Sequence, residues 1–385
     1  MPKVFGQLFL SMETYDFVFV GAGCAGLSMI HYLLKSKMKN AKILILEPNP
    51  EIPNKTWCYW SEVPFDIHPP ENIISWDSFN FISKDKKLKK SLGKLKYYYL
   101  KSSDFFSSIL NEISKAKNIT KLEEKVNQIT SEGLYNKVET SSGNQFLAKT
   151  IFDSRIEEPL SPTILKQVFL GWKIKTTNSC FDTDGVTLMN FIESKNKFDF
   201  FYILPFSETE ALVEYTAYSK ESINYDILET KLLEYLKSNF QISSYEISYS
   251  EFGSIPMTTT LSQKQINPSI IKIGTGAGWI KASTGYGFSS IQKKCKSIID
   301  QLEKGKMIQI SRSTRFDFYD NILLNIAHKW PQKLQSIFMN LFETSSAQDV
   351  LQFLSEETTI KEEIQILQKV KFRPFIKSLL NYERH

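Results

Sequence analysis

An α/β fold is predicted by two glycine-rich crossings from strand to helix, which lie about 250 residues apart. Both are typical of a Rossmann-like domain that binds a dinucleotide. Short β-rich segments without long helices lie between them, and they indicate an antiparallel sheet that forms a separate, substrate-covering domain. The part after the second crossing is helical in pattern. A chain of 385 residues is also too long for one small core.

The first crossing starts with a mostly apolar strand, residues 16–20, which stops at a glycine. Three glycines follow at G-x-G-x-x-G spacing, and apolar residues recur behind them with helical period. Gly21 permits the tight turn, Gly23 lets the backbone approach phosphates, and Gly26 lets the helix pack closely on the sheet. The helix N-terminus faces the negative pyrophosphate. We therefore expect this loop to bind the cofactor through Gly21, Ala22, Gly23, Cys24, Ala25 and Gly26.

A second strand, residues 42–46, ends at Glu47. This acid lies about 20 residues beyond Gly26, where the hydroxyl groups of a ribose need an acceptor. A loop follows and is expected to carry Thr56-Trp57-Cys58-Tyr59-Trp60 past the cofactor. Trp57 either stacks beside the ring of a flavin or belongs to the core, and the sequence leaves both open.

The rest of the first part contains further strands and one helix. Residues 84–94 carry six lysines and indicate an exposed hairpin, which is either solvated or in contact with a membrane. Asp153-Ser154-Arg155 closes this part, and such a turn often places a backbone group on the cofactor, so Arg155 is a candidate binding residue. Strands are expected at residues 96–100, 138–140 and 150–153, and a helix at residues 104–113.

The middle of the chain changes character. Its β-rich segments are residues 169–175, 186–191, 199–204 and 211–218. A helix over residues 225–239 follows, and Ile255-Pro256-Met257 leads the chain back. This order predicts the antiparallel sheet.

The second crossing begins with a strand at residues 270–273 and continues through a glycine-rich loop, residues 274–288. Two such crossings converge on one extended cofactor. The helix N-terminus near residues 285–288 can place its positive end on a flavin ring oxygen, which favours FAD over NAD alone. The expected binding residues here are Gly274, Thr275, Gly285, Tyr286, Gly287 and Phe288.

The order of these elements predicts how the chain is divided and how its two ends are built. Met12 can be the true start, in which case residues 1–11 are an unstructured extension. Residues 369–384 form either a packed terminal helix or a membrane-surface helix. We predict four segments. The two parts of the FAD-binding domain are residues 12–160 and 263–305, the substrate domain is residues 161–262, and the helical C-terminal region is residues 306–385.

Composition excludes several classes of protein. The net charge of +5 is mild, so it fits a phosphate cofactor or anionic lipid but does not indicate nucleic acid. The four cysteines form no C-x-x-C pair and the four histidines show no ligand spacing, so we expect no disulfide framework, no metal site and a reducing cytoplasm. No apolar run reaches the roughly 18 residues that span a bilayer.

The motifs together carry a resemblance. The sequence resembles the lycopene cyclase family of FAD-containing carotenoid cyclases from Tyr15 to about Thr358. The motifs are residues 21–26, Thr56-Trp57-Cys58-Tyr59-Trp60, Asp153-Ser154-Arg155, Phe169-Leu170-Gly171-Trp172, Leu188-Met189-Asn190-Phe191, Leu204-Pro205-Phe206, Leu212-Val213-Glu214-Tyr215-Thr216, Ile255-Pro256-Met257 and residues 274–288.

This resemblance implies the flavoprotein fold of aromatic hydroxylases and geranylgeranyl reductases. It also implies that lycopene is cyclised through a monocyclic intermediate to β-carotene, with reduced FAD required, NADPH or NADH as reductant, and no net redox change. Glu214 matches the glutamate regarded as catalytic in the family. Tyr215 stands where plant-type members carry a second acid, so the number of acting carboxyl groups stays open. Thr275 stands where related flavoproteins place an aspartate on the ribityl chain.

The chemistry gives an independent reason for an acid. Protonating a polyene end needs a carboxyl that is still neutral near pH 7, and burial in an apolar strand raises a carboxyl pKa. Glu214 follows three apolar residues, but strand alternation alone leaves open that its side chain faces outward.

Two alternatives to a cyclase remain on the same fold. One is a redox flavoenzyme, either a hydroxylase or a prenyl-chain reductase, and the other is a non-enzymatic prenyl-binding escort protein. Because lycopene resides in bilayers, we expect peripheral association with the inner face of the cytoplasmic membrane. The type and number of rings and the preferred nicotinamide stay open.

Overall fold

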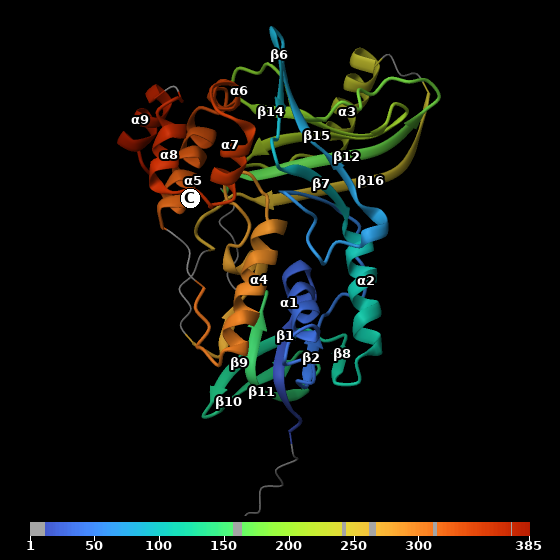
Figure 1. Ribbon diagram of the computed structural model, residues 1–385, viewed down its shortest axis with the longest axis vertical. Helices are drawn as coiled ribbons and strands as arrows, with labels where there is room; N and C mark the ends of the chain where they lie inside the picture. The colour runs from blue at the N-terminus through green and yellow to red at the C-terminus, as the bar shows by residue number, and fades with distance from the viewer. Residues whose placement is uncertain (1–11, 157–163, 241–243, 262–266, 311–313, 371) are drawn as a thin grey trace, which may run out of the picture.

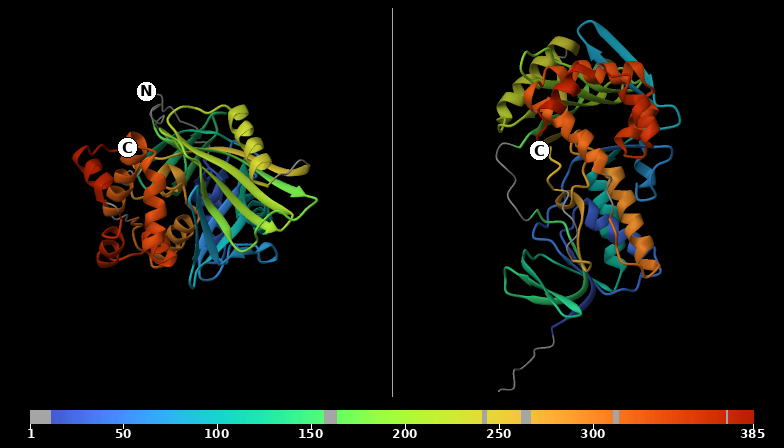
Figure 2. Two further views of the ribbon diagram at one scale, coloured as in Figure 1. Left: turned by 90° about the horizontal axis from the view of Figure 1, so that it is seen from above. Right: turned by 90° about the vertical axis from the view of Figure 1, so that its left-hand side faces the viewer.

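The structure is a computed structural model that describes residues 12–156, 164–240, 244–261, 267–310, 314–370 and 372–385. The predicted extension at residues 1–11 lies outside these ranges. Two sheets form the body of the molecule, and one lies across the end of the other (Figure 1). Helices of the C-terminal part gather beside the second sheet, as both views in Figure 2 show.

The first sheet has seven strands, of which five run parallel: β1 (Thr14–Val20), β2 (Ile43–Leu46), β8 (Ile119–Leu122), β11 (Gln145–Asp153) and β17 (Ile270–Lys272). A hairpin of β9 (Val126–Glu132) and β10 (Tyr135–Thr140) adds antiparallel strands beside β11. Val20 pairs with Leu46 and Asp153, so β1, β2 and β11 end at one edge. Helices α1 (Cys24–Leu34) and α4 (Phe288–Glu303) start at this edge and run side by side (Figure 1).

The second sheet also has seven strands, in the order β16-β12-β15-β14-β13-β5-β6. One face is covered by α3 (Tyr225–Phe240), whose Leu228, Leu232 and Leu236 are buried against it. The expected hairpin of lysines is present as β5 and β6, and it joins this sheet through the parallel pair of β5 and β13. The strands are β5 (Ser78–Ser83), β6 (Lys86–Ser91), β12 (Lys166–Thr176), β13 (Val186–Phe191), β14 (Phe198–Ser207), β15 (Glu210–Ser219) and β16 (Tyr245–Pro256).

A small antiparallel sheet joins the two layers. It consists of β3 (Thr56–Ser61), β4 (Ile74–Trp76) and β7 (Lys96–Lys101), and α2 (Ser102–Lys115) follows it. Along β7, Tyr97 contributes to the core of the second sheet, whereas Tyr98 contributes to the core of the first layer. Residues 56–60 were expected in a loop, but they form the strand β3, which pairs with β7. Successive side chains of a strand point to opposite faces, so one strand contributes to both cores.

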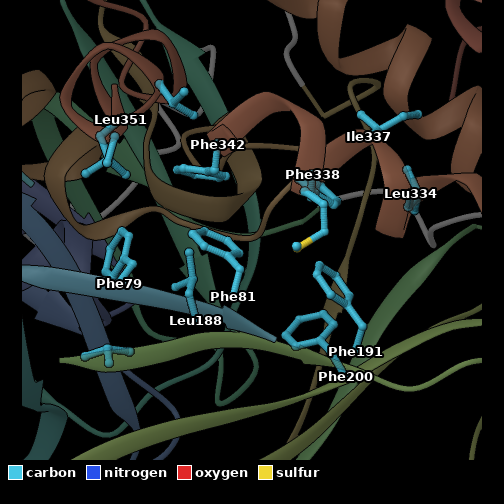
Figure 3. Close-up of a cluster of buried hydrophobic side chains, with 14 of the residues drawn as sticks. Phe79, Phe81, Leu188, Phe191, Phe200, Leu334, Ile337, Phe338, Phe342 and Leu351 are labelled. Atoms are coloured by element: carbon cyan, nitrogen blue, oxygen red, sulfur yellow. The ribbon is translucent and has the colours of Figure 1, made fainter. Parts of the chain in front are cut away.

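The C-terminal helices pack on the second sheet, as Figure 3 shows. Phe342 stacks on Phe81 with ring centroids 4.3 Å apart, and Phe338 lies 5.6 Å from Phe198. Buried Asp320 forms an ion pair with Lys281, with 2.9 Å between the carboxylate oxygen and the ammonium nitrogen. This pair connects the glycine-rich loop to these helices. They are α5 (Thr314–Lys329), α6 (Lys333–Thr344), α7 (Ala347–Leu354), α8 (Ile360–Leu367) and α9 (Phe372–Leu380).

This architecture confirms the predicted fold class: an α/β dinucleotide-binding layer, a mainly antiparallel second sheet and a helical C-terminal part. The division into four segments stays a prediction. The second sheet takes β5 and β6 from the first of those segments, and β16 is a full strand of twelve residues where the sequence indicated only a return of the chain.

Candidate active site

The first glycine loop is shaped as the sequence predicts. Gly21 has φ of +98°, and a side chain there would collide with Ser154. A Cβ on Gly26 would lie 2.5 Å from the carbonyl oxygen of Gly21, so the helix and the strand end approach too closely for any side chain. At Gly23, by contrast, no heavy atom of the described residues, apart from its two chain neighbours, lies within 4 Å of the position of a Cβ. The open space is therefore at Gly23, in front of the N-terminus of α1.

Glu47 lies directly beside this loop. One carboxylate oxygen accepts a hydrogen bond of 2.7 Å from the Ala22 backbone N–H, and the other accepts one of 3.0 Å from Asn49. A carboxylate has about four acceptor positions, so both oxygens can still bind ribose hydroxyl groups. The structure thus brings Glu47 to the loop across the β1–β2 pair.

The second crossing meets the first. A Cβ on Gly274, whose φ is +64°, would lie 3.1 Å from the Cβ of Ala25. Behind this contact, Gln292 of α4 donates a hydrogen bond of 2.9 Å to Ser28 of α1. The N-cap of α4 is Gly287, which has no capping side chain, and the first turn of the helix has no acid. Two positive helix ends are therefore available to one anionic ligand.

Arg155 has a structural partner. Its guanidinium donates two hydrogen bonds of 2.9 Å to the carboxylate of Asp153, which is fully buried, and Lys272 donates a third of 2.9 Å. Burial alone would raise the pKa of Asp153, but these donors outweigh it and hold that pKa below its usual range. Gly276 packs on the backbone of Arg155, so this turn lies against the second crossing.

Aromatic side chains surround the N-terminus of α4. Trp57 is half-buried and lies 5.2 Å from Phe105 and 5.8 Å from Phe288 between ring centroids. Phe288 also stacks on Tyr59 at 5.0 Å and is only 5% exposed, so its backbone rather than its ring is available to a ligand. A small pocket opens here, lined among others by Trp60, Tyr286, Gly287 and Phe288.

Three buried tyrosine hydroxyls link this region to the second sheet. The Tyr97 hydroxyl lies 3.0 Å from that of Tyr202 and 2.9 Å from that of Tyr286. Tyr202 also donates to the sulfur of Cys58 at 3.2 Å. Tyr286, predicted to bind the cofactor, is thereby connected to the strand that carries Glu214, because Tyr202 pairs with Glu214.

Glu214 faces inward. Its neighbours Val213 and Tyr215 pack under α3 on the far face of the sheet, so Glu214 points to the face that carries Tyr202. Burial, followed by the charge of Glu251, raises the pKa of Glu214 to about 8, although the Thr216 hydroxyl donates a 2.6 Å hydrogen bond that works the other way. The structure thus supplies a carboxyl that keeps its proton near neutral pH.

Glu251 is the residue that sequence reasoning missed. On β12, Gly171 pairs with Glu214 on one side and with Glu251 on the other, so the two acids lie in one row across three strands. A Cβ on Gly171 would lie 3.3 Å from Glu251 Cγ and 3.4 Å from Glu214 Cβ. A side chain at this position would therefore press tightly against both acids. Glu251 is 3% exposed, and burial raises its pKa as well.

The arrangement therefore combines a buried acid of raised pKa with an open dinucleotide cradle. Comparisons with known proteins identify the family and the fold. A family described as "Lycopene cyclase protein" matches residues 16–380. No curated protein is significantly similar in sequence.

Solved structures show where the fold recurs. A geranylgeranyl bacteriochlorophyll reductase-like protein from Thermoplasma acidophilum superposes with a TM-score of 0.61 and 14% identity, over 96% of this chain and 99% of that chain. The p-nitrophenol 4-monooxygenase PnpA from Pseudomonas putida gives 0.57 and 14%, over 97% and 100%. Halogenase PltM in complex with phloroglucinol and FAD gives 0.55 and 11%, over 95% and 86%. The family match runs from β1 to α9, and the chain belongs to the lycopene cyclase family.

Proposed function

We propose that this protein is a lycopene β-cyclase, which closes the linear ends of lycopene to β-ionone rings in a redox-neutral reaction. The observation that carries the proposal is Glu214, whose side chain faces the interior between the two layers and whose pKa is raised by burial. An acid must be neutral to donate, and a pKa near the working pH is best suited to that task.

The residues around Glu214 suit a carbocation. Tyr202 and Gly171 flank it on the neighbouring strands, and Glu251 lies beyond Gly171. Glu214 donates its proton to the terminal double bond, and the second double bond then attacks the cation to close the ring. In a site shielded from water, negative charge and aromatic faces stabilise such a cation far better than in solution.

The chain's own residues fit FAD. The space at Gly23, the two uncapped helix ends and the carboxylate of Glu47 match a pyrophosphate and a ribose. The PltM structure, which contains FAD on this fold, supports the same assignment. Reduced flavin would supply negative charge beside the cation, and NADPH or NADH would reduce it beforehand.

A single substitution tests the cofactor. Gly23→Val should leave folding unchanged, because the space around that Cβ is open, yet it should abolish FAD binding by filling the room of the pyrophosphate. Flavin absorbance after reconstitution measures binding, and thermal unfolding measures the fold. A variant that binds FAD as tightly as wild type would refute the assigned cradle.

Product analysis tests the reaction. Wild-type protein with lycopene and pre-reduced FAD should yield β-carotene without consuming NADPH in proportion. Equal amounts of product and oxidised nicotinamide would indicate the redox alternative instead. Binding of lycopene without any turnover would indicate an escort protein.

Attachment to a membrane is part of the proposal, because lycopene is a bilayer solute. Within the described ranges, no helix is both long and apolar enough to cross a membrane. Attachment would then be peripheral and salt-sensitive, with lysines and aromatic residues at the surface. Sedimentation with anionic vesicles at low and high salt measures it, and a protein that never sediments with them contradicts it.

A further inference from the structure

The two acids on either side of Gly171 form a carboxyl pair, by which we mean the side chains of Glu214 and Glu251. Both face the same side of the second sheet, and the row Glu214-Gly171-Glu251 is fixed by the register of β15, β12 and β16. Two buried carboxyl groups on either side of one glycine disfavour each other's charged form, and the charge of Glu251 contributes to the raised pKa of Glu214. The pair therefore favours a state with one proton and one negative charge.

Hydrogen bonds decide which acid is ionised. One oxygen of Glu251 accepts two hydrogen bonds, of 2.8 Å from the Thr56 backbone N–H and 3.1 Å from the Tyr249 hydroxyl. Within the described ranges, Glu214 accepts one, from Thr216. Donors stabilise the charged form, so these hydrogen bonds favour the charge on Glu251 and the proton on Glu214.

The second oxygen of Glu251 is the informative atom. It is buried and, among the residues that the structure describes, has no hydrogen-bond partner. Other titratable groups near the pair include Lys55, whose ammonium donates to the carbonyl of Phe252, and the uncharged side chains of Tyr99, Cys58 and Tyr286. A buried carboxylate oxygen without a donor is costly, and such orphans in native structures call for an explanation.

We propose that Glu251 is the base of the reaction. Each cyclisation ends when a ring carbon loses a proton, and Glu251 accepts that proton. This inference rests on the proposed cyclase function and assigns the second proton transfer of that reaction. Glu214 and Glu251 would then act as one acid–base unit, and the missing second acid next to Glu214 in the sequence would be supplied by β16.

The proposed step balances without an oxidant or reductant. The Glu214 carboxyl gives its proton to the CH carbon of the terminal double bond, which leaves a tertiary cation. The π electrons of the second double bond form the ring bond, and the charge moves to the methyl-bearing ring carbon. Glu251 takes the proton of the adjacent junction carbon, and those electrons become the ring double bond. The proton then returns from Glu251 to Glu214, and the pair regains its initial state.

The test uses full-length Glu251→Gln with reduced FAD and lycopene. We expect a rate at least about 100-fold lower, the usual worth of one proton-transfer group. We also expect residual product whose ring double bond lies elsewhere, because water then accepts a proton from a different carbon next to the cation. The high-pH limit of activity should move to lower pH, because Glu214 loses the neighbouring charge that raises its pKa.

Controls separate the possible failures. Glu246→Gln changes an exposed acid on the same strand and should behave as wild type. If wild type forms no cyclic carotenoid, the proposed function fails and this inference with it. If wild type cyclises and Glu251→Gln forms only β-rings at a wild-type rate and pH limit, the inference alone fails.

A second variant decides the matter if Glu251→Gln does not bind FAD or fold. Gly171→Ala puts a methyl group between the two acids, 3.3–3.4 Å from their carbon atoms, and keeps both carboxyls. It should lower the rate at least about tenfold, a part of the usual worth of a proton transfer, and yield the same displaced ring double bonds. Unchanged rate and product in this variant would overturn the inference.

Discussion

Two carboxylate regions in the interior of this molecule differ in what surrounds them. In the first sheet, Asp153 receives hydrogen bonds from Arg155 and Lys272, and its pKa lies below its usual range. In the second sheet, Glu214 and Glu251 lie on either side of Gly171, no cation among the described residues is in hydrogen-bond contact with them, and their pKa values are raised. Removal from water is common to both regions. The hydrogen bonds of two cationic partners lower the pKa of Asp153, whereas burial without such a partner raises the pKa values of Glu214 and Glu251.

Two other buried acids also have a cationic partner. Glu363 is fully buried and forms an ion pair of 2.9 Å with Arg315. Asp320 forms an ion pair of 2.9 Å with Lys281. Asp199 is the instructive exception, since burial raises its pKa although the Tyr215 hydroxyl donates a hydrogen bond of 2.8 Å to it, on the face under α3. A raised pKa alone therefore does not mark the site, whereas a facing second acid and an adjoining cofactor cradle do.

The largest effect on activity is expected at Glu214, because its role depends on the proton that it carries. Glu214→Gln should keep the fold and bound FAD, because an amide and a carboxyl are nearly the same size. Cyclisation should fall about 10²–10⁴-fold, because an amide cannot protonate an alkene. Product formation from lycopene with pre-reduced FAD measures the loss, and flavin reduction by NADPH should be unchanged.

The matched control for this variant is Glu210→Gln. Glu210 lies on the same strand, but it pairs with Lys173 at 3.1 Å near the strand end. It should cyclise as wild type. Full activity of Glu214→Gln would refute the assigned role, even if the overall cyclase reaction is correct.

A change in the first region should instead affect stability. Lys272→Met removes one of the donors to a fully buried carboxylate and should lower the free energy of unfolding by about 1–3 kcal/mol. Urea unfolding at pH 7 measures it. Lys149→Met is the control, because it breaks an exposed pair with Asp16 and should matter little.

The same variant has a pH signature. The pKa of Asp153 is lower in the folded state than the usual value of about 3.9, so its ionisation stabilises the fold above that pH. The stabilisation is lost as pH falls through the lowered pKa. The difference between wild type and Lys272→Met should therefore shrink in acid, and a difference that stays constant down to pH 2 would contradict this account.

The contrast between the regions also explains what the sequence could predict. The glycine spacing, Glu47 and the two crossings are local patterns, so the amino-acid sequence alone predicts the cradle. Glu214 is identified through the family motif, but its inward orientation is not, because alternation in a strand has two phases. Glu251 carries no local signal. Its place opposite Glu214 depends on the register of two strands across Gly171, which only the folded sheet defines.

Residues 56–60 illustrate the same limit. The side chains of residues 57–60 alternate between two cores, and the sequence shows an apolar or aromatic residue at each of these positions. Such a run is ambiguous between a loop packed by aromatics and a strand buried on both faces. Trp57 lies near the N-terminus of α4, and its role beside a flavin stays a prediction.

The smallest effect is expected from the hydrogen bond that Thr216 donates to Glu214. Thr216→Val removes the 2.6 Å hydrogen bond to Glu214 and keeps the side-chain shape. That bond favours the ionised carboxyl, so its loss should raise the pKa of Glu214 further. Activity requires the protonated acid and falls as pH rises through this pKa, so the high-pH limit should move to higher pH.

The direction of that shift is the decisive part. Glu251→Gln is expected to move the same limit to lower pH, because a neighbouring charge is removed rather than a donor. Thr176→Val serves as control, since its hydroxyl bonds the carbonyl of Asn178 at the end of β12, away from the pair. Rates across pH with pre-reduced FAD measure both shifts. A limit that moves the same way in both variants would show that Glu214 is not the group that titrates in the reaction.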